Sequence, residues 1–159
     1  MNTVRPVHLT HPSRKEDARL LSGLGAYTSD QVRADSLHLV VVRSVHAHAR
    51  LTSIHTEQAQ SSPGVRWVAT APDLDALGAQ PIPHPVSVKH VDGSDQIVVR
   101  MPILARDTVH FVGQPIAFVV ADTLWQAMDA AEKLEVNYEA LDAVVDVRAA
   151  VLLHSPVLH

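Results

Sequence analysis

Histidine is the residue type that most readily suggests chemistry here, because the chain contains eleven of them. The best-spaced pair is His46 and His48, since residues two apart on a strand point to the same face. A zinc site needs one or two further ligands and outer hydrogen-bond partners, and none follows at a fixed spacing. We interpret these side chains as surface or turn histidines. His154 and His159 have no supporting pattern, so no metal ligand is assigned.

Serine, glycine and carboxylate patterns also fail to form a recognisable active site. The sequence has no Gly-x-Ser-x-Gly elbow, no P-loop and no dinucleotide fingerprint. Gly23 and Gly25 are interpreted as turn glycines. Paired carboxylates are interpreted as helix caps or solvated charges, because no apolar pocket accompanies them. These pairs are Asp73 and Asp75, Asp92 and Asp95, and Glu132 and Glu135. No catalytic or cofactor-binding residue is assigned.

The tetrapeptide Val112-Gly113-Gln114-Pro115 interrupts two apolar segments where a sheet would change direction. The structural interpretation is a β-bulge or corner, with glycine supplying the backbone angle and proline ending the ladder. The functional interpretation is a polar amide presented to a ligand or a neighbouring chain. We favour the structural interpretation and keep Gly113, Gln114 and Pro115 as interface candidates.

Composition excludes several classes of protein. The 159 residues are 47% apolar but only 4% aromatic, so the core must consist of Val, Leu, Ile and Ala. Thirteen Lys and Arg against seventeen Asp and Glu give a net charge of −4, which argues against a nucleic-acid clamp. The absence of cysteine excludes disulfides, thiolate metal sites, a cysteine nucleophile and an iron–sulfur cluster held by this chain. No signal-peptide or membrane-length apolar stretch occurs, so we expect a cytoplasmic protein.

The elements follow from periodicity and capping signals. Residues 1–13 are expected to form a flexible N-terminal arm. Ser13 and Glu16 then form a capping box for a short helix that ends at Gly23. Short helical segments are also expected at 56–60, from 70 onward and at 147–153. Strands are expected at 37–43, 47–55, 65–70, 109–112, 116–121 and 135–138, with a slip in alternation at Ser53.

The clearest predicted element is a helix of about twelve residues over 123–134, opened by a capping box of Thr123 and Gln126. The proline-rich stretch 79–102 is expected to be a long excursion with one hairpin, 87–91 against 96–100, around Asp92-Gly93. Strands and helices mix without strict βαβ alternation. The fold class is therefore predicted to be α+β, with a mixed, mainly antiparallel sheet and a single domain over 14–159.

An ordered set of phrases resembles the large subunit of the molybdenum hydroxylases, the xanthine dehydrogenase and aldehyde oxidase family. The matching phrases are residues 16–30, 42–51, 63–65, 70–74, 102–105, 109–117, 119–123, 130–132 and 136–141. Each phrase alone is weakly specific, but together they run in order from about residue 14 to the C-terminus. The segment is similar to the α/β hammerhead domain that begins the large subunit, and 42–51 resembles its first hairpin.

The resemblance implies an oxidoreductase complex in which this chain has no catalytic residues. In the family, a molybdenum–pterin cofactor hydroxylates an aldehyde or N-heterocycle with oxygen from water, and electrons pass through two [2Fe–2S] clusters to FAD. The implied partners are the pterin-binding remainder of the large subunit, an iron–sulfur subunit and an FAD subunit. The family's pterin-binding and catalytic residues lie beyond this segment, and Gln114 is not its molybdenum-adjacent glutamine.

Three functions are considered for the chain. The leading hypothesis is a hammerhead subunit or domain that scaffolds the large subunit and lines access to its active site. The chain would then be a separately encoded subunit or a fragment. The alternative is a free-standing binding or assembly module that keeps the fold without the chemistry. The least favoured option is an independent hydrolase that uses the histidine-rich surface.

Overall fold

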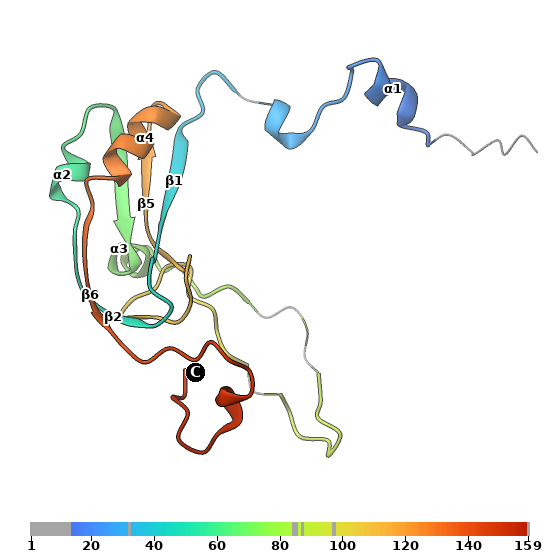
Figure 1. Cartoon of the computed structure of the whole chain (residues 1–159). Coiled ribbons are helices and arrows are strands. Elements are labelled where there is room, and N and C mark those ends of the chain that lie inside the picture. Colours follow the sequence, from blue (N-terminus) through green and yellow to red (C-terminus); the bar gives the residue numbers. More distant parts are fainter. Residues whose placement is uncertain (1–13, 32, 84–85, 87, 97, 159) are drawn as a thin grey trace, which may run out of the picture. The chain divides into compact units, whose positions relative to one another are not determined.

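The computed structural model describes residues 14–31, 33–83, 86, 88–96 and 98–158 (Figure 1). The chain divides into two compact units, Met1–Ser36 and Leu37–His159. The smaller unit contains α1 (Asp17–Leu21) and a 3-10 helix, Thr28–Asp30. Gly23 follows α1 with φ +74°, as predicted for its end. The predicted arm 1–13, including Ser13, lies outside the described residues.

The larger unit contains two three-stranded antiparallel sheets. The first sheet has the order β1 (His38–Arg43), β5 (Pro115–Ala121), β3 (Val65–Thr70), and the second has β4 (Thr108–Val109), β2 (Ala49–His55), β6 (Glu135–Ala140). The α+β class is confirmed, although one mixed sheet was expected. The difference arises because β1 and β2, neighbours in sequence, pair with different strands. They therefore do not form the hairpin expected over 42–51.

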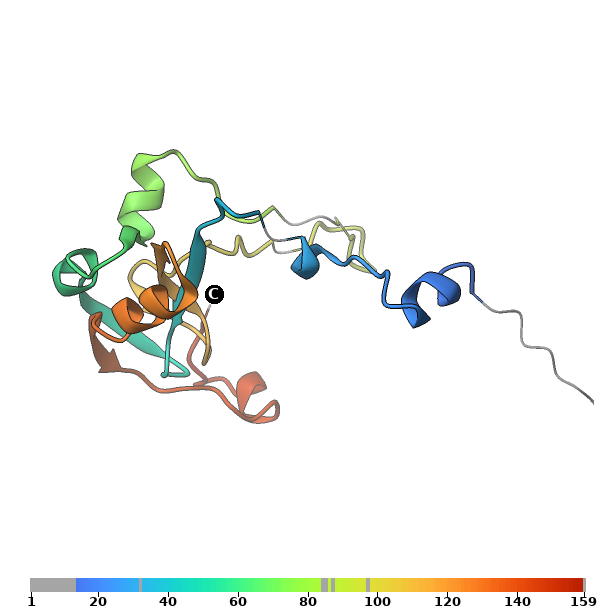
Figure 2. The same cartoon turned by 90° about the horizontal axis from the view of Figure 1, so that it is seen from above.

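Helix α4 (Leu124–Ala131) packs on the first sheet, and Figure 2 shows it beside β1. The shorter helices are α2 (Glu57–Gln60), α3 (Ala71–Ala76) and the 3-10 helix Ala149–Val151. In the part of the chain that the structure describes, no helix has the length and apolar character needed to cross a bilayer.

Two small apolar clusters meet along β5. Under α4, Val119 and Ala121 pack with a set of small residues: Ala59, Val68, Ala127 and Ala130. At the other end of β5, Ile116 packs with Ala49, Ala105 and Val109 of the second sheet region. These side chains bear out the prediction of a core made of Val, Ile, Leu and Ala. Strand β5 therefore belongs to both clusters.

Several predicted elements are shorter than expected. The helix predicted over 123–134 ends at Ala131, and the strand predicted over 109–112 contains only Thr108–Val109. The last helical segment is a single 3-10 turn. In the excursion, isolated bridges join Ile82 to Met101 and Lys89 to Asp95, the second around the turn at Gly93, in place of the predicted hairpin strands. Residues 87 and 97 of that hairpin lie outside the described residues.

Candidate functional site

The corner between β1 and β5 holds the three interface candidates and is closed by backbone hydrogen bonds. Gly113 has φ +87°, a conformation that L side chains rarely adopt. Its N–H donates to the Ser44 carbonyl at 2.8 Å, and the Ser44 N–H donates to the Gln114 carbonyl at 2.9 Å. The pairing of β1 with β5 shifts register between Val42 and Arg43 at this point. The corner is therefore an irregularity in the ladder, as the structural interpretation predicted.

The Gln114 side chain lies inside this corner. It is only 5% exposed, and its Oε1 accepts the backbone N–H of His110 at 2.7 Å. Arg43 closes the outside by donating from Nη1 to the Gly113 carbonyl at 2.9 Å. Buried polar groups need such partners because an unpaired one loses its hydration without compensation. The amide thus has a structural task, and the interface role of Gly113, Gln114 and Pro115 stays a prediction.

The histidine pair lies just before β2 rather than within a strand, and its members face different partners. The ring of His46 packs on Tyr138 with centroids 4.6 Å apart, and His48 stacks on His110 at 5.9 Å. Nδ1 of His48 also lies 2.7 Å from the Asp142 carbonyl oxygen. Tyr138, which packs on His46, is partly buried, and this burial raises the pKa of its phenol. Among the described residues, no three His, Asp or Glu side chains are grouped as metal ligands would be.

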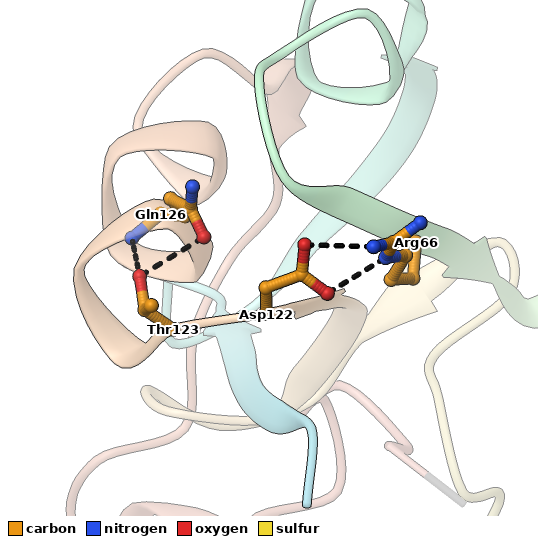
Figure 3. A network of polar contacts seen from close by, with 4 residues as sticks. All are labelled: Arg66, Asp122, Thr123 and Gln126. Atoms are coloured by element: carbon orange, nitrogen blue, oxygen red, sulfur yellow. Dashed lines mark hydrogen bonds and ion pairs between the residues drawn. The ribbon is translucent and has the colours of Figure 1, made fainter. Parts of the chain in front are cut away.

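A polar network fixes the start of α4 against the edge of the first sheet (Figure 3). The predicted cap is confirmed: Thr123 Oγ1 accepts the Gln126 N–H at 3.2 Å and donates to Gln126 Oε1 at 3.0 Å. Beside it, Arg66 makes a two-pronged ion pair with Asp122, with N–O distances of 2.7 and 2.9 Å. Sequence reasoning missed this pair because its members are far apart in the chain and carry no local signal.

Gly64 completes the network from the β3 side. Its carbonyl accepts the Asp122 N–H at 2.9 Å, and its φ is +77°. A Cβ at this position would overlap the side-chain amide of Gln126. The backbone angle therefore favours glycine here, and any larger residue would also displace the Gln126 side chain.

A shallow hollow lies where the proline-rich excursion leaves and rejoins the sheets. It lies between α3 and residues 102–106, and Leu74, Ile103 and Leu104 contribute apolar walls. An ion pair between Asp75 and Arg106 joins its two sides. The hollow has one paired acid and one paired base, so it shows no group placed for acid–base catalysis.

Comparison with known protein families identifies the family of this chain. Residues 22–142 match the model described as "Aldehyde oxidase and xanthine dehydrogenase, a/b hammerhead domain". The chain belongs to this family. It is 37% identical to the nicotine 6-hydroxylase large subunit of Paenarthrobacter nicotinovorans, covering 87% of this chain and 16% of that protein. Its identity to the carbon monoxide dehydrogenase large chain of Hydrogenophaga pseudoflava is 38%, covering 91% and 17%.

Solved structures agree with this assignment. Quinoline 2-oxidoreductase from Pseudomonas putida 86 superposes with a TM-score of 0.75 at 39% identity, covering 87% of this chain and 17% of that one. The Cu,Mo-CO dehydrogenase superposes with a TM-score of 0.73 at 38% identity, covering 91% and 17%. The hammerhead fold and the resemblance to molybdenum hydroxylase large subunits are confirmed. The chain spans about a sixth of the length of the relatives it matches.

The range that matches the hammerhead model contains all the candidate sites described above. It begins in the smaller unit and includes the corner, the histidines and the α4 network. Each of these has a local structural explanation. The chain has no cysteine, so it supplies no thiolate for a [2Fe–2S] cluster.

Proposed function

We propose that this chain is the hammerhead part of a molybdenum hydroxylase large subunit, where it scaffolds the subunit and lines access to the active site. The observation that carries the proposal is the family match over 22–142 together with the superposition on large-subunit structures. The proposal treats residues 14–159 as one hammerhead domain. It assigns this chain no catalytic residue.

The proposed complex is cytoplasmic and carries molybdopterin, [2Fe–2S] clusters and FAD on its other parts. The proposed partners are the pterin-binding remainder of the large subunit, an iron–sulfur subunit and an FAD subunit. One relative is named as subunit gamma of the 6-hydroxypseudooxynicotine dehydrogenase complex, and others as large subunits or large chains, which supports a multi-subunit assembly. When bound elsewhere in the complex, the molybdenum cofactor would supply the hydroxylation chemistry.

The test is purification from the native host through a tag on this chain, followed by molybdenum analysis and identification of co-eluting polypeptide. We expect about one molybdenum per tagged chain and a pterin-binding large-subunit sequence, joined to this chain or separate from it. Recovery of the tagged chain alone and free of molybdenum would overturn the proposal. That outcome would favour a free-standing module that keeps the hammerhead fold.

A further inference from the structure

The face of the first sheet opposite α4 is apolar and only partly covered. Ile116 and Ala69 on this face are fully buried, whereas Leu39 and Trp67 are exposed. Strand β5 lies between β1 and β3 (Figure 1), and its residues alternate between the two faces. Val119 and Ala121 point to the covered face and are buried under α4. Phe118 and Val120 point the other way and are only half-buried. A sheet with one face in water normally alternates apolar with polar residues, and β5 does not.

Register extends this apolar surface across all three strands. Val120 lies between Leu39 of β1 and Trp67 of β3, and directly opposite residues in antiparallel pairs share a face. Phe118 likewise lies beside Val41. We call these five residues, Leu39, Val41, Trp67, Phe118 and Val120, the outer face. None of them is charged or polar apart from the indole N–H.

Two of the five outer-face residues are exposed, and the two aromatic rings among the five pack against each other. Leu39 is 53% exposed and Trp67 is 40% exposed. The Trp67 and Phe118 rings pack edge to face, with centroids 4.9 Å apart. Such a pair holds two large side chains in fixed positions, which lowers the entropy lost when a partner covers them. Aromatic side chains held this way are typical anchors of protein interfaces.

We propose that the outer face is the docking surface for the remainder of the large subunit. This inference rests on the proposed function. The occupant follows from length, since the part that matches this chain is only 16–17% of the matched relatives, which carry the hammerhead as one part. A permanent neighbour fits the uncharged surface, because obligate interfaces resemble a divided core while transient ones are more polar. The corner at Gly113, Gln114 and Pro115 leads into β5, where the fully buried Ile116 separates it from Phe118 on the outer face.

The experiment uses the absence of native cysteine. Leu39→Cys places a single thiol on the outer face, and Trp125→Cys places one on α4, where the indole is 72% exposed. The tagged assembly is purified from the native host with each variant and treated with a maleimide. Mass spectrometry then follows labelling of this chain's own peptide. We expect the thiol at position 39 to react at least about tenfold more slowly than the thiol at 125, because the partner excludes water and reagent there.

Equal labelling rates at the two positions, whether fast or slow, overturn the assignment of this face. Protection at position 39 in an assembly made only of copies of this chain assigns the face to self-association and also overturns it. Failure of the proposed function itself is seen separately, as the absence of molybdenum and of large-subunit sequence in the wild-type preparation. Replacing both Leu39 and Trp67 by Glu is expected to release a separate partner.

Discussion

The central strand of the first sheet and the edge strand β6 of the second follow opposite rules. In β6, Glu135, Asn137 and Glu139 alternate with half-buried Val136 and Tyr138. This is the ordinary pattern for a sheet with one face in water. In β5 every residue is apolar, whether or not its side chain is covered. The contrast indicates that the second sheet already has a polar face suited to water. The first sheet instead has an apolar face suited to a partner.

The largest expected loss of stability comes from a substitution at the buried end of β5. Ile116 is fully buried against Ala49, Ala105 and Val109, so Ile116→Ala should lower the free energy of unfolding by about 2–5 kcal/mol. Denaturant titration of this chain measures it. Val120→Ala, four residues further on the same strand face, is the matched control and should cost less because Val120 is only half-buried. Equal losses of unfolding free energy for the two variants would contradict the difference in burial between the two ends of β5.

Substitution of Gly64 tests how much the close packing of α4 on the sheet contributes to stability. Gly64→Ala should destabilise the chain by about 1–2 kcal/mol through the positive φ alone, and further through overlap with Gln126. Gly93→Ala is the control, because φ there is +84° but a Cβ would meet open space. Adding Gln126→Ala to Gly64→Ala should recover part of the loss. If thermal unfolding shows the same loss at both glycines, the close approach of α4 is unimportant.

Substitution on the outer face should have little effect on this chain alone. Leu39→Thr removes apolar area that is already half exposed, so about 1 kcal/mol or less is expected. Val40→Thr, on the adjacent residue that packs against the α4 cluster, should cost more. Binding of a hydrophobic dye should fall for the first variant. An unchanged dye signal together with a large loss of stability would show that the outer face is already covered.

The smallest expected effect is a pH dependence at the end of β3. Hydrogen bonds from the Thr70 hydroxyl and N–H hold the pKa of Asp73 below its usual value. Because the folded pKa is the lower one, the stabilisation is present above about pH 4, the unfolded value, and is lost as pH falls through the folded pKa. Thermal unfolding of Asp73→Asn should therefore vary less than wild type between about pH 5 and 3. Parallel curves would contradict this role of the carboxylate.

Local signals predicted the elements near β5 well and the long-range pairing poorly. The slip expected at Ser53 appears as a register shift between Leu51 and Ser53, and the cap predicted at Thr123 is formed. The division into two sheets was missed because no local pattern specifies which distant strand a segment pairs with.

The candidate site shows the same division. The backbone role of Gly113 could be inferred from residue type, because glycine readily adopts positive φ. The inward direction of Gln114 depends on the N–H of His110, and the Arg66–Asp122 pair on contact between separate strands. The apolar run of β5 is typical of a central strand, and β5 does lie between β1 and β3. Only the register with Leu39 and Trp67 reveals that one of its faces remains partly exposed.

The pairing of β2 with β6 has a consequence for synthesis on the ribosome. Ala49 pairs with Ala140, so β2 leaves the ribosome long before most of its partner strand is made. At about 5–20 residues per second, that interval is on the order of ten seconds. During this time its backbone edge is an open template for pairing with other chains. The nascent chain is therefore expected to depend on chaperone shielding until residues 135–140 have emerged, and early termination before them would leave that edge of β2 unpaired.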